Sequence, residues 1–82
     1  MDFLLNHIEA LIFCSPSPIK LADLKACLSE MFNADVPEED IQNAILKLEE
    51  KYAADEYSFQ IFKSGGGYQF LTKPAYQASI SI

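Results

Sequence analysis

The sequence of 82 residues contains no arginine and no tryptophan, and it has one histidine and two cysteines. All six basic residues are lysines, and twelve acids bring the formal charge to −6. Because affinity for nucleic-acid phosphates comes mainly from Lys and Arg, this balance argues against a protein that grips a phosphate backbone. Cys14 and Cys27 are too few for a disulfide scaffold or a zinc site, and their apolar neighbours predict buried, reduced thiols.

Long apolar runs are missing as well. None approaches the roughly 18 residues that indicate a membrane span, so we expect no membrane partner. Asp2 places an acid where a secretory signal needs positive charge, so we expect no signal peptide. A chain of this length holds one domain at most.

Helical periodicity predicts three helices, over residues 3–14, 21–32 and 37–52. Asp2 is the expected N-cap of the first helix. The third helix opens with Pro37 and three acids, which suit the first turn and the positive end of the helix dipole. The side chains predicted to face the core are Leu4, Leu5, Ile8, Leu11, Ile12, Leu21, Leu24, Leu28, Met31, Phe32, Ile41, Ala44, Ile45, Leu48 and Tyr52.

A change to alternating aromatic and β-branched residues predicts a β-hairpin over residues 57–63 and 68–73, with a loop at 64–67. Ile19 is expected to add a short extended contact. If Lys63 pairs with Tyr68, one face of the hairpin buries three large side chains and the other face carries four residues. The first set is Phe59, Ile61 and Phe70, and the second is Gln60, Phe62, Gln69 and Leu71.

The order of helix, short extended piece, helix, helix and hairpin predicts an α+β fold of the winged helix-turn-helix type, with three helices and a C-terminal two-stranded wing. We expect this domain to span residues 1–76. The glycine run at 65–67 is followed by a strand rather than a helix. It therefore fits the tip of the wing better than a phosphate-binding loop.

No catalytic, cofactor-binding or metal site is expected. His7 and Cys14 lie seven residues apart, about 10 Å along a helix, which is too far for a nucleophile–base pair. The acids cluster at residues 38–40 and 49–50, where solvated helix charge explains them. We therefore predict no enzyme and no cofactor.

The outer face of the third helix is expected to carry Glu39, Asn43, Leu46 and Glu50. Most winged-helix regulators use this helix to contact DNA bases, for which Arg, Lys, Asn or Gln are suited. Two carboxylates would repel phosphate, so direct specific DNA binding is disfavoured, although Lys47, Lys51 and Lys63 could form a weak patch. A winged-helix DNA-binding transcription regulator is the alternative hypothesis.

Large apolar side chains remain outside the predicted core. They lie on the outer side of the first helix, on the back of the third helix and on the outer face of the hairpin. This surplus in so small a domain predicts a protein–protein interface, unless the C-terminal tail or another part of the protein covers it. The candidate interface residues are Phe3, Ala10, Phe13, Leu46, Phe62 and Leu71.

Four stretches resemble the N-terminal winged-helix domain of the segregation and condensation protein B family. Residues 8–15 (IEALIFCS) are similar to its opening helix, residues 19–24 (IKLADL) to the start of its second helix, and residues 36–41 (VPEEDI) to the start of its third. Residues 66–76 (GGYQFLTKPAY) resemble its wing and are the most specific match. Lys20 departs from the usual hydroxyl or acid N-cap, and the wing has one more glycine than the family pattern.

The resemblance implies a non-enzymatic subunit of the bacterial SMC–kleisin condensin complex, acting in chromosome condensation and segregation. It implies a homodimer formed with the help of this domain. It also implies binding to the kleisin subunit, segregation and condensation protein A, and through it to SMC, in the cytoplasm at the nucleoid. The family has a second winged-helix domain, so we expect residues 77–82 to be a tail or the start of a linker towards it.

Overall fold

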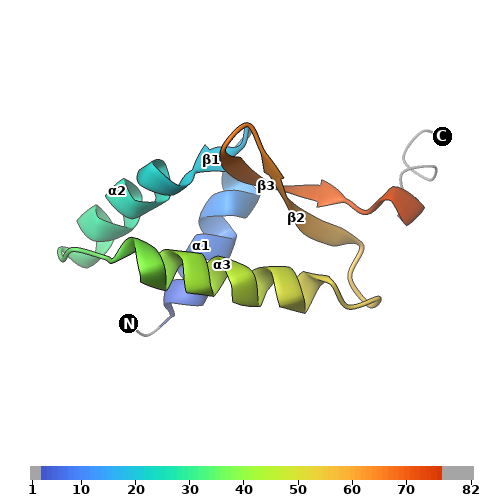
Figure 1. The fold of residues 1–82 in the computed structure, drawn as a ribbon, viewed down its shortest axis with the longest axis horizontal. Coiled ribbons are helices and arrows are strands. Elements are labelled where there is room, and N and C mark those ends of the chain that lie inside the picture. Colours follow the sequence, from blue (N-terminus) through green and yellow to red (C-terminus); the bar gives the residue numbers. More distant parts are fainter. Residues whose placement is uncertain (1–2, 77–82) are drawn as a thin grey trace.

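Three helices and a small antiparallel sheet form the fold in the computed structural model, which describes residues 3–76. In chain order the elements are α1 (Leu4–Cys14), β1 (Ile19–Lys20), α2 (Leu21–Phe32), α3 (Glu38–Tyr52), β2 (Phe59–Ser64) and β3 (Gly67–Thr72). Residues 74–76 are also helical. Figure 1 shows α2 beside the start of α3, the hairpin beside its end, and α1 behind it. The predicted winged-helix architecture is confirmed.

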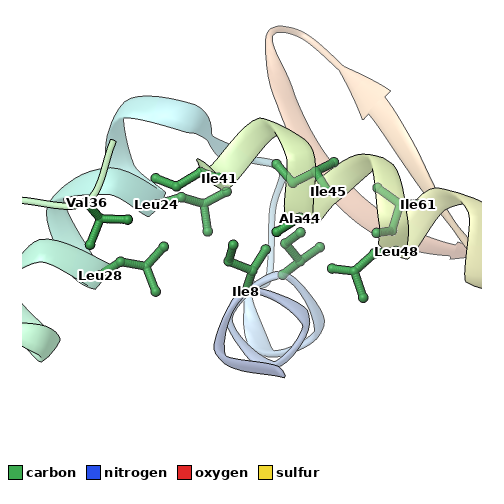
Figure 2. Packing of buried hydrophobic residues seen from close by; sticks show 10 residues of the cluster. Ile8, Leu24, Leu28, Val36, Ile41, Ala44, Ile45, Leu48 and Ile61 are labelled. Carbon is green, nitrogen blue, oxygen red and sulfur yellow. The ribbon is translucent and has the colours of Figure 1, made fainter. Parts of the chain in front are cut away.

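The core lies where α1, α2, α3 and the hairpin meet, and all ten of its buried hydrophobic residues are aliphatic. Figure 2 shows Ile8 of α1 in the middle of this cluster, with the α2 side chains on one side and Ile61 of β2 on the other. The helical periodicity placed most of them correctly. The buried residues are Ile8, Ile12, Leu24, Leu28, Val36, Ile41, Ala44, Ile45, Leu48 and Ile61.

The sheet has the strand order β1-β3-β2, with every pair antiparallel. The predicted hairpin register is confirmed, since Lys63 pairs with Tyr68 and Ile61 with Phe70. The loop is shorter than expected, because Ser64 pairs with Gly67 and leaves only two residues in the turn. Both of these, Gly65 and Gly66, have positive φ, as a two-residue type I′ turn requires.

The turn between α2 and α3 is fixed by local hydrogen bonds. Asn33 ends α2 in the left-handed conformation, which Asn tolerates better than most residues. The Ser29 hydroxyl accepts the backbone N–H of Val36 at 3.1 Å. Lys25 donates to the Val36 carbonyl at 2.9 Å and pairs with Asp35 at 3.3 Å. These bonds therefore fix the orientation of α2 relative to α3.

Two large side chains predicted to be buried are exposed instead. Met31 is 48% exposed in the last turn of α2, and Phe59 is 47% exposed at the first position of β2. Both have the helical or strand phase of the core. Both also lie at the end of their element, where fewer neighbours pack against it. Phase predicts the direction of a side chain but not the extent of the surface opposite it.

Both cysteines were predicted to be buried, and this prediction is wrong: Cys14 and Cys27 are free and exposed. Local apolar composition suggested burial, but each helix turns its cysteine away from its buried residues. The expected N-cap Asp2 lies outside the described residues. Phe3 occupies the N-cap position of α1, with φ 66° and no side-chain capping hydrogen bond. Residues 77–82, expected to form a tail or linker, also lie outside the described part of the chain.

Candidate protein interface

An exposed strip of α1, here the α1 strip, contains three of the six predicted interface residues. The strip consists of Phe3, Asn6, Ala10 and Phe13, all exposed and spaced three, four and three residues apart. This spacing keeps Asn6, Ala10 and Phe13 on one side of the helix, opposite the buried Ile8, and Phe3 is the N-cap residue just before the first turn. The Phe3 side chain is 71% exposed and that of Phe13 is 68% exposed. Two phenylalanines therefore face solvent at the ends of one helix.

Phe13 also contacts the wing. Its ring lies edge-on to that of Phe70 on β3, with 6.1 Å between the ring centroids. Phe70 in turn packs edge-on against Tyr52 at 4.9 Å. The Phe13 ring at the end of the α1 strip therefore rests on side chains of the sheet and α3, which fix its position.

The other three predicted residues lie on two further surfaces. Leu46 is 57% exposed on the outer face of α3, among the exposed residues Glu39, Asn43 and Glu50, as predicted. Leu71 is 40% exposed on the outer face of the sheet. Phe62, in the same layer, is half-buried. The structure brings Phe3, Ala10 and Phe13 onto one helix and does not unite the six residues in a single patch.

A polar contact that sequence analysis did not predict joins α1 to α3. The Tyr52 hydroxyl donates to Glu9 Oε2 at 2.7 Å, and Lys51 Nζ lies 3.2 Å from the same oxygen. Lys51 also lies over the rings of Tyr52 and Tyr57, at 5.1 and 5.8 Å from their centroids. More than forty positions separate the partners in sequence, so no local pattern could indicate the contact.

The charges of this cluster stabilise one another. The hydrogen bond from Tyr52, assisted by Lys51, lowers the pKa of the Glu9 carboxyl below its ordinary 4.5, although partial burial opposes this shift. Partial burial and the hydrogen bond to Glu9 raise the pKa of Tyr52. The hydrogen bond to Glu9 also raises the pKa of Lys51. The cluster holds α1 against α3 and has the features of a structural contact.

A hollow of about 500 Å³ opens between the start of α1 and the first half of α3. Leu4, Leu5 and Ala44 supply apolar side chains, and Phe3 lies at its edge. The polar side chains that line it are Asn6, Asp40, Asn43 and Lys47. Phase along α3 marks Asp40 and Lys47 as one flank of the helix, but only the packing of α1 shows that this flank borders a hollow.

Metal-ligating side chains do not cluster in residues 3–76. Within that range no group of three His, Cys, Asp or Glu side chains could hold a metal ion. His7 packs edge-on against the Phe32 ring at 5.2 Å. Of the lysines expected to form a weak basic patch, Lys51 is paired with Glu9, and Lys63 lies 5.9 Å from the centroid of the Tyr68 ring. No helix in this range is long and apolar enough to cross a membrane.

Fold and surface together define a winged-helix domain whose third helix exposes carboxylates and a leucine, and whose first helix exposes phenylalanines. Comparison with a family model identifies the family of this domain. The chain belongs to the family of the segregation and condensation complex subunit ScpB, whose model matches residues 6–82.

Solved structures agree with this fold. A conserved hypothetical protein from Chlorobium tepidum is 34% identical, with a TM-score of 0.73 over 94% of this chain and 45% of its own. A dimer of a ScpB N-terminal domain complexed with a ScpA peptide is 21% identical, with a TM-score of 0.83 over 98% of this chain and 86% of that chain. ScpB from Mycobacterium tuberculosis is 12% identical, with a TM-score of 0.78 over 98% of this chain and 46% of that chain.

The last two likenesses show the fold. This chain spans less than half the length of the proteins from C. tepidum and M. tuberculosis. No curated protein matches it.

Proposed function

We propose that this domain belongs to a non-enzymatic architectural subunit of the bacterial SMC–kleisin complex, acting in chromosome condensation and segregation. In this role it forms a homodimer and binds the kleisin subunit, in the cytoplasm at the nucleoid. Family membership supports the complex. A relative of the same fold, a dimer of a ScpB N-terminal domain complexed with a ScpA peptide, supports the two partners.

The single observation that carries the dimer is the α1 strip. If two copies of α1 pack antiparallel about a twofold axis, Phe3 meets the partner's Phe13 and Asn6 meets the partner's Ala10. The same strip is then complementary to itself, as a twofold interface requires. Ala10, with its small side chain, lets the two helices approach near the middle of the strip, and the phenylalanines close both ends.

The energetics favour the strip as the centre of the interface. Full burial of a phenylalanine side chain is worth about 1.5–3 kcal/mol, and a twofold dimer buries two copies of Phe3 and two of Phe13. The helix is short, so the strip alone does not provide the roughly 1,200–2,000 Å² of a standard interface. Surfaces next to the strip must contribute the remaining buried area, and they form a rim around the few aromatic residues at the centre.

The first prediction is that Ala10→Glu makes the intact protein monomeric, or weakens its dimer at least tenfold. The change places a carboxylate at the centre of the interface, where the partner helix would desolvate it. Light scattering coupled to size-exclusion chromatography measures the mass over a range of concentrations. Ala26→Glu is the matched control, because Ala26 is an exposed alanine inside α2.

Loss of the dimer in both variants, or in neither, would contradict an interface on the α1 strip. A wild-type protein that stays monomeric at high micromolar concentration would contradict the proposed homodimer itself. Circular dichroism confirms that each variant is folded before its mass is interpreted.

A further inference from the structure

Glu9 is the only residue of α1 that carries a formal charge at neutral pH, with histidine counted as neutral. It lies three positions after Asn6 and four positions before Phe13, so on the helix surface it is a neighbour of both. Asn6 and Phe13 belong to the α1 strip, which is itself uncharged. A single carboxylate therefore borders the strip that carries the proposed dimer.

The antiparallel arrangement of the dimer brings the two copies of this carboxylate close together. Asn6 meets the partner's Ala10, so the twofold axis passes beside residue 8 of each helix. Glu9 lies one position from that centre, and its two copies are therefore offset by only about 3 Å along the helix axes. A twofold axis perpendicular to both helices keeps the two Glu9 side chains on the same side of the helix pair. At the usual interaxial distance of about 8–10 Å, their separation is close to one Debye length at physiological salt.

Within one copy, α3 neutralises this carboxylate. Lys51 Nζ lies 3.2 Å from Glu9 Oε2, and the Tyr52 hydroxyl donates to the same oxygen at 2.7 Å. The hydrogen bond from Tyr52 lowers the pKa of the Glu9 carboxyl, so this group is ionised at neutral pH. Among the acids of residues 3–76, only Asp35 also has a lysine partner. The Lys51 ammonium group therefore offsets a negative charge that faces its own copy across the twofold axis.

We propose that Lys51 is a positioning residue of the homodimer, and that it acts by neutralising Glu9 beside the twofold axis. Removal of the ammonium group leaves two carboxylates that repel each other where the α1 strips must meet. The hydrogen bond from Tyr52 to Glu9 is retained, so the domain keeps its fold. The inference rests on the proposed homodimer and adds to it a residue of α3, outside the strip, on which dimerisation depends.

The test measures the Kd of the dimer by analytical ultracentrifugation of the intact protein at neutral pH. At low salt, Lys51→Gln is expected to raise the Kd by about fivefold, because two unpaired carboxylates then face each other. At about 0.5 M salt the increase should largely disappear, since charges at this distance are screened. A requirement for Lys51 as packing alone would not show this dependence on salt.

Lys63→Gln is the matched control for Lys51→Gln. Both substitutions remove one positive charge from a lysine that lies over a tyrosine ring, at 5.9 Å from Tyr68 for Lys63 and at 5.1 Å from Tyr52 for Lys51. Lys63 has no carboxylate partner among residues 3–76. Lys63→Gln should therefore leave the Kd almost unchanged, which separates the local effect from the change in net charge.

A second substitution distinguishes neutralisation from a structural role. Glu9→Gln removes the charge but keeps an oxygen that accepts the hydrogen bond from Tyr52. The double variant Glu9→Gln with Lys51→Gln should therefore dimerise as the wild type does, and Lys51→Arg should retain the wild-type Kd. Circular dichroism confirms that each variant is folded.

The outcomes separate this inference from the proposed dimer. If the wild type is dimeric but Lys51→Gln raises the Kd no more than Lys63→Gln, the inference is overturned and the homodimer stands. The same holds if the double variant dimerises no better than Lys51→Gln. A wild type that stays monomeric at high micromolar concentration overturns both the inference and the homodimer.

Discussion

At the scale of single residues, the Tyr52 hydroxyl is the group whose removal tests the contact between α1 and α3 most directly. It donates to Glu9 at 2.7 Å, and the Glu9 side chain is only 27% exposed. We predict that Tyr52→Phe lowers the free energy of unfolding by about 1.5 kcal/mol, the low end of the usual range for a hydrogen bond to a charged group, because Glu9 is partly exposed. Urea denaturation measures it. Tyr57→Phe is the control, because the Tyr57 hydroxyl bonds to no described residue.

The effect of Tyr52→Phe should depend on pH with a definite sign. The Glu9 pKa is lowered in the folded protein from its ordinary 4.5. The contribution of the carboxylate is therefore complete above pH 4.5 and is lost as the pH falls through the folded-state pKa. The difference between wild type and Tyr52→Phe should shrink from neutral pH to about pH 3. A difference that stays constant over this range would contradict a charge-dependent contact.

The cysteines show at the same scale where sequence analysis failed. Composition around Cys14 and Cys27 predicted burial, but both thiols are exposed. Burial of one residue depends on its phase and on what packs opposite it, and apolar neighbours in sequence report neither. The same limit applies to Glu9 and Tyr52, whose contact requires two helices to cross at one point.

At the scale of elements, the wing depends on a close approach between Gly67 and Pro18. A Cβ at Gly67 would lie 2.9 Å from two Pro18 atoms, one of them in the backbone. This contact explains the third glycine of the run, which the turn itself does not need. We predict that Gly67→Ala destabilises the domain by about 1–3 kcal/mol, because β1 must move away from β3. Thermal unfolding tests this prediction, and the midpoint of Gly67→Ala should be lower than that of the wild type.

Ser64→Ala is the control for Gly67→Ala. Ser64 pairs with Gly67 across the hairpin and is exposed, so its truncation leaves the approach to Pro18 unchanged. Equal thermal midpoints for wild type and Gly67→Ala would show that β1 is not held in this position. The turn glycines test a different cause, because at Gly65 and Gly66 the positive φ alone disfavours other residues.

Elements are the level at which the sequence was most informative. The helical period gave three helices, and hairpin alternation gave the correct register, because one face of each element is buried. The errors, Met31 and Phe59, fall at element ends. There the direction of a side chain is set by phase, but its burial depends on the length of the neighbouring elements.

At the scale of the whole molecule, the surfaces could be predicted only in part. Phe3, Ala10 and Phe13 share one helix, so their common face followed from phase alone. The hollow brings together the start of α1 and the flank of α3, some forty residues apart in sequence. Its polar side chains therefore have no common sequence pattern, and only the packing of the two helices shows that they line one hollow.

The charge distribution leads to the last prediction, which concerns DNA. The outer face of α3, the helix that DNA-binding relatives of this fold insert into the major groove, exposes Glu39, Leu46 and Glu50. Wild-type protein should therefore not retard duplex DNA in a gel at low salt, where non-specific phosphate binding is strongest.

A variant makes this negative result informative. Glu39→Lys with Glu50→Lys reverses two charges on the same face and changes the formal charge from −6 to −2, since each replacement adds +2. If the carboxylates are what prevents binding, the double variant should retard DNA weakly, and added salt should abolish the shift. Clear salt-dependent retardation by the wild type would instead favour a DNA-binding regulator and would require a basic surface outside α3. On this prediction the acidic face of α3 excludes nucleic acid as a partner, and the α1 strip is the surface that remains for a protein.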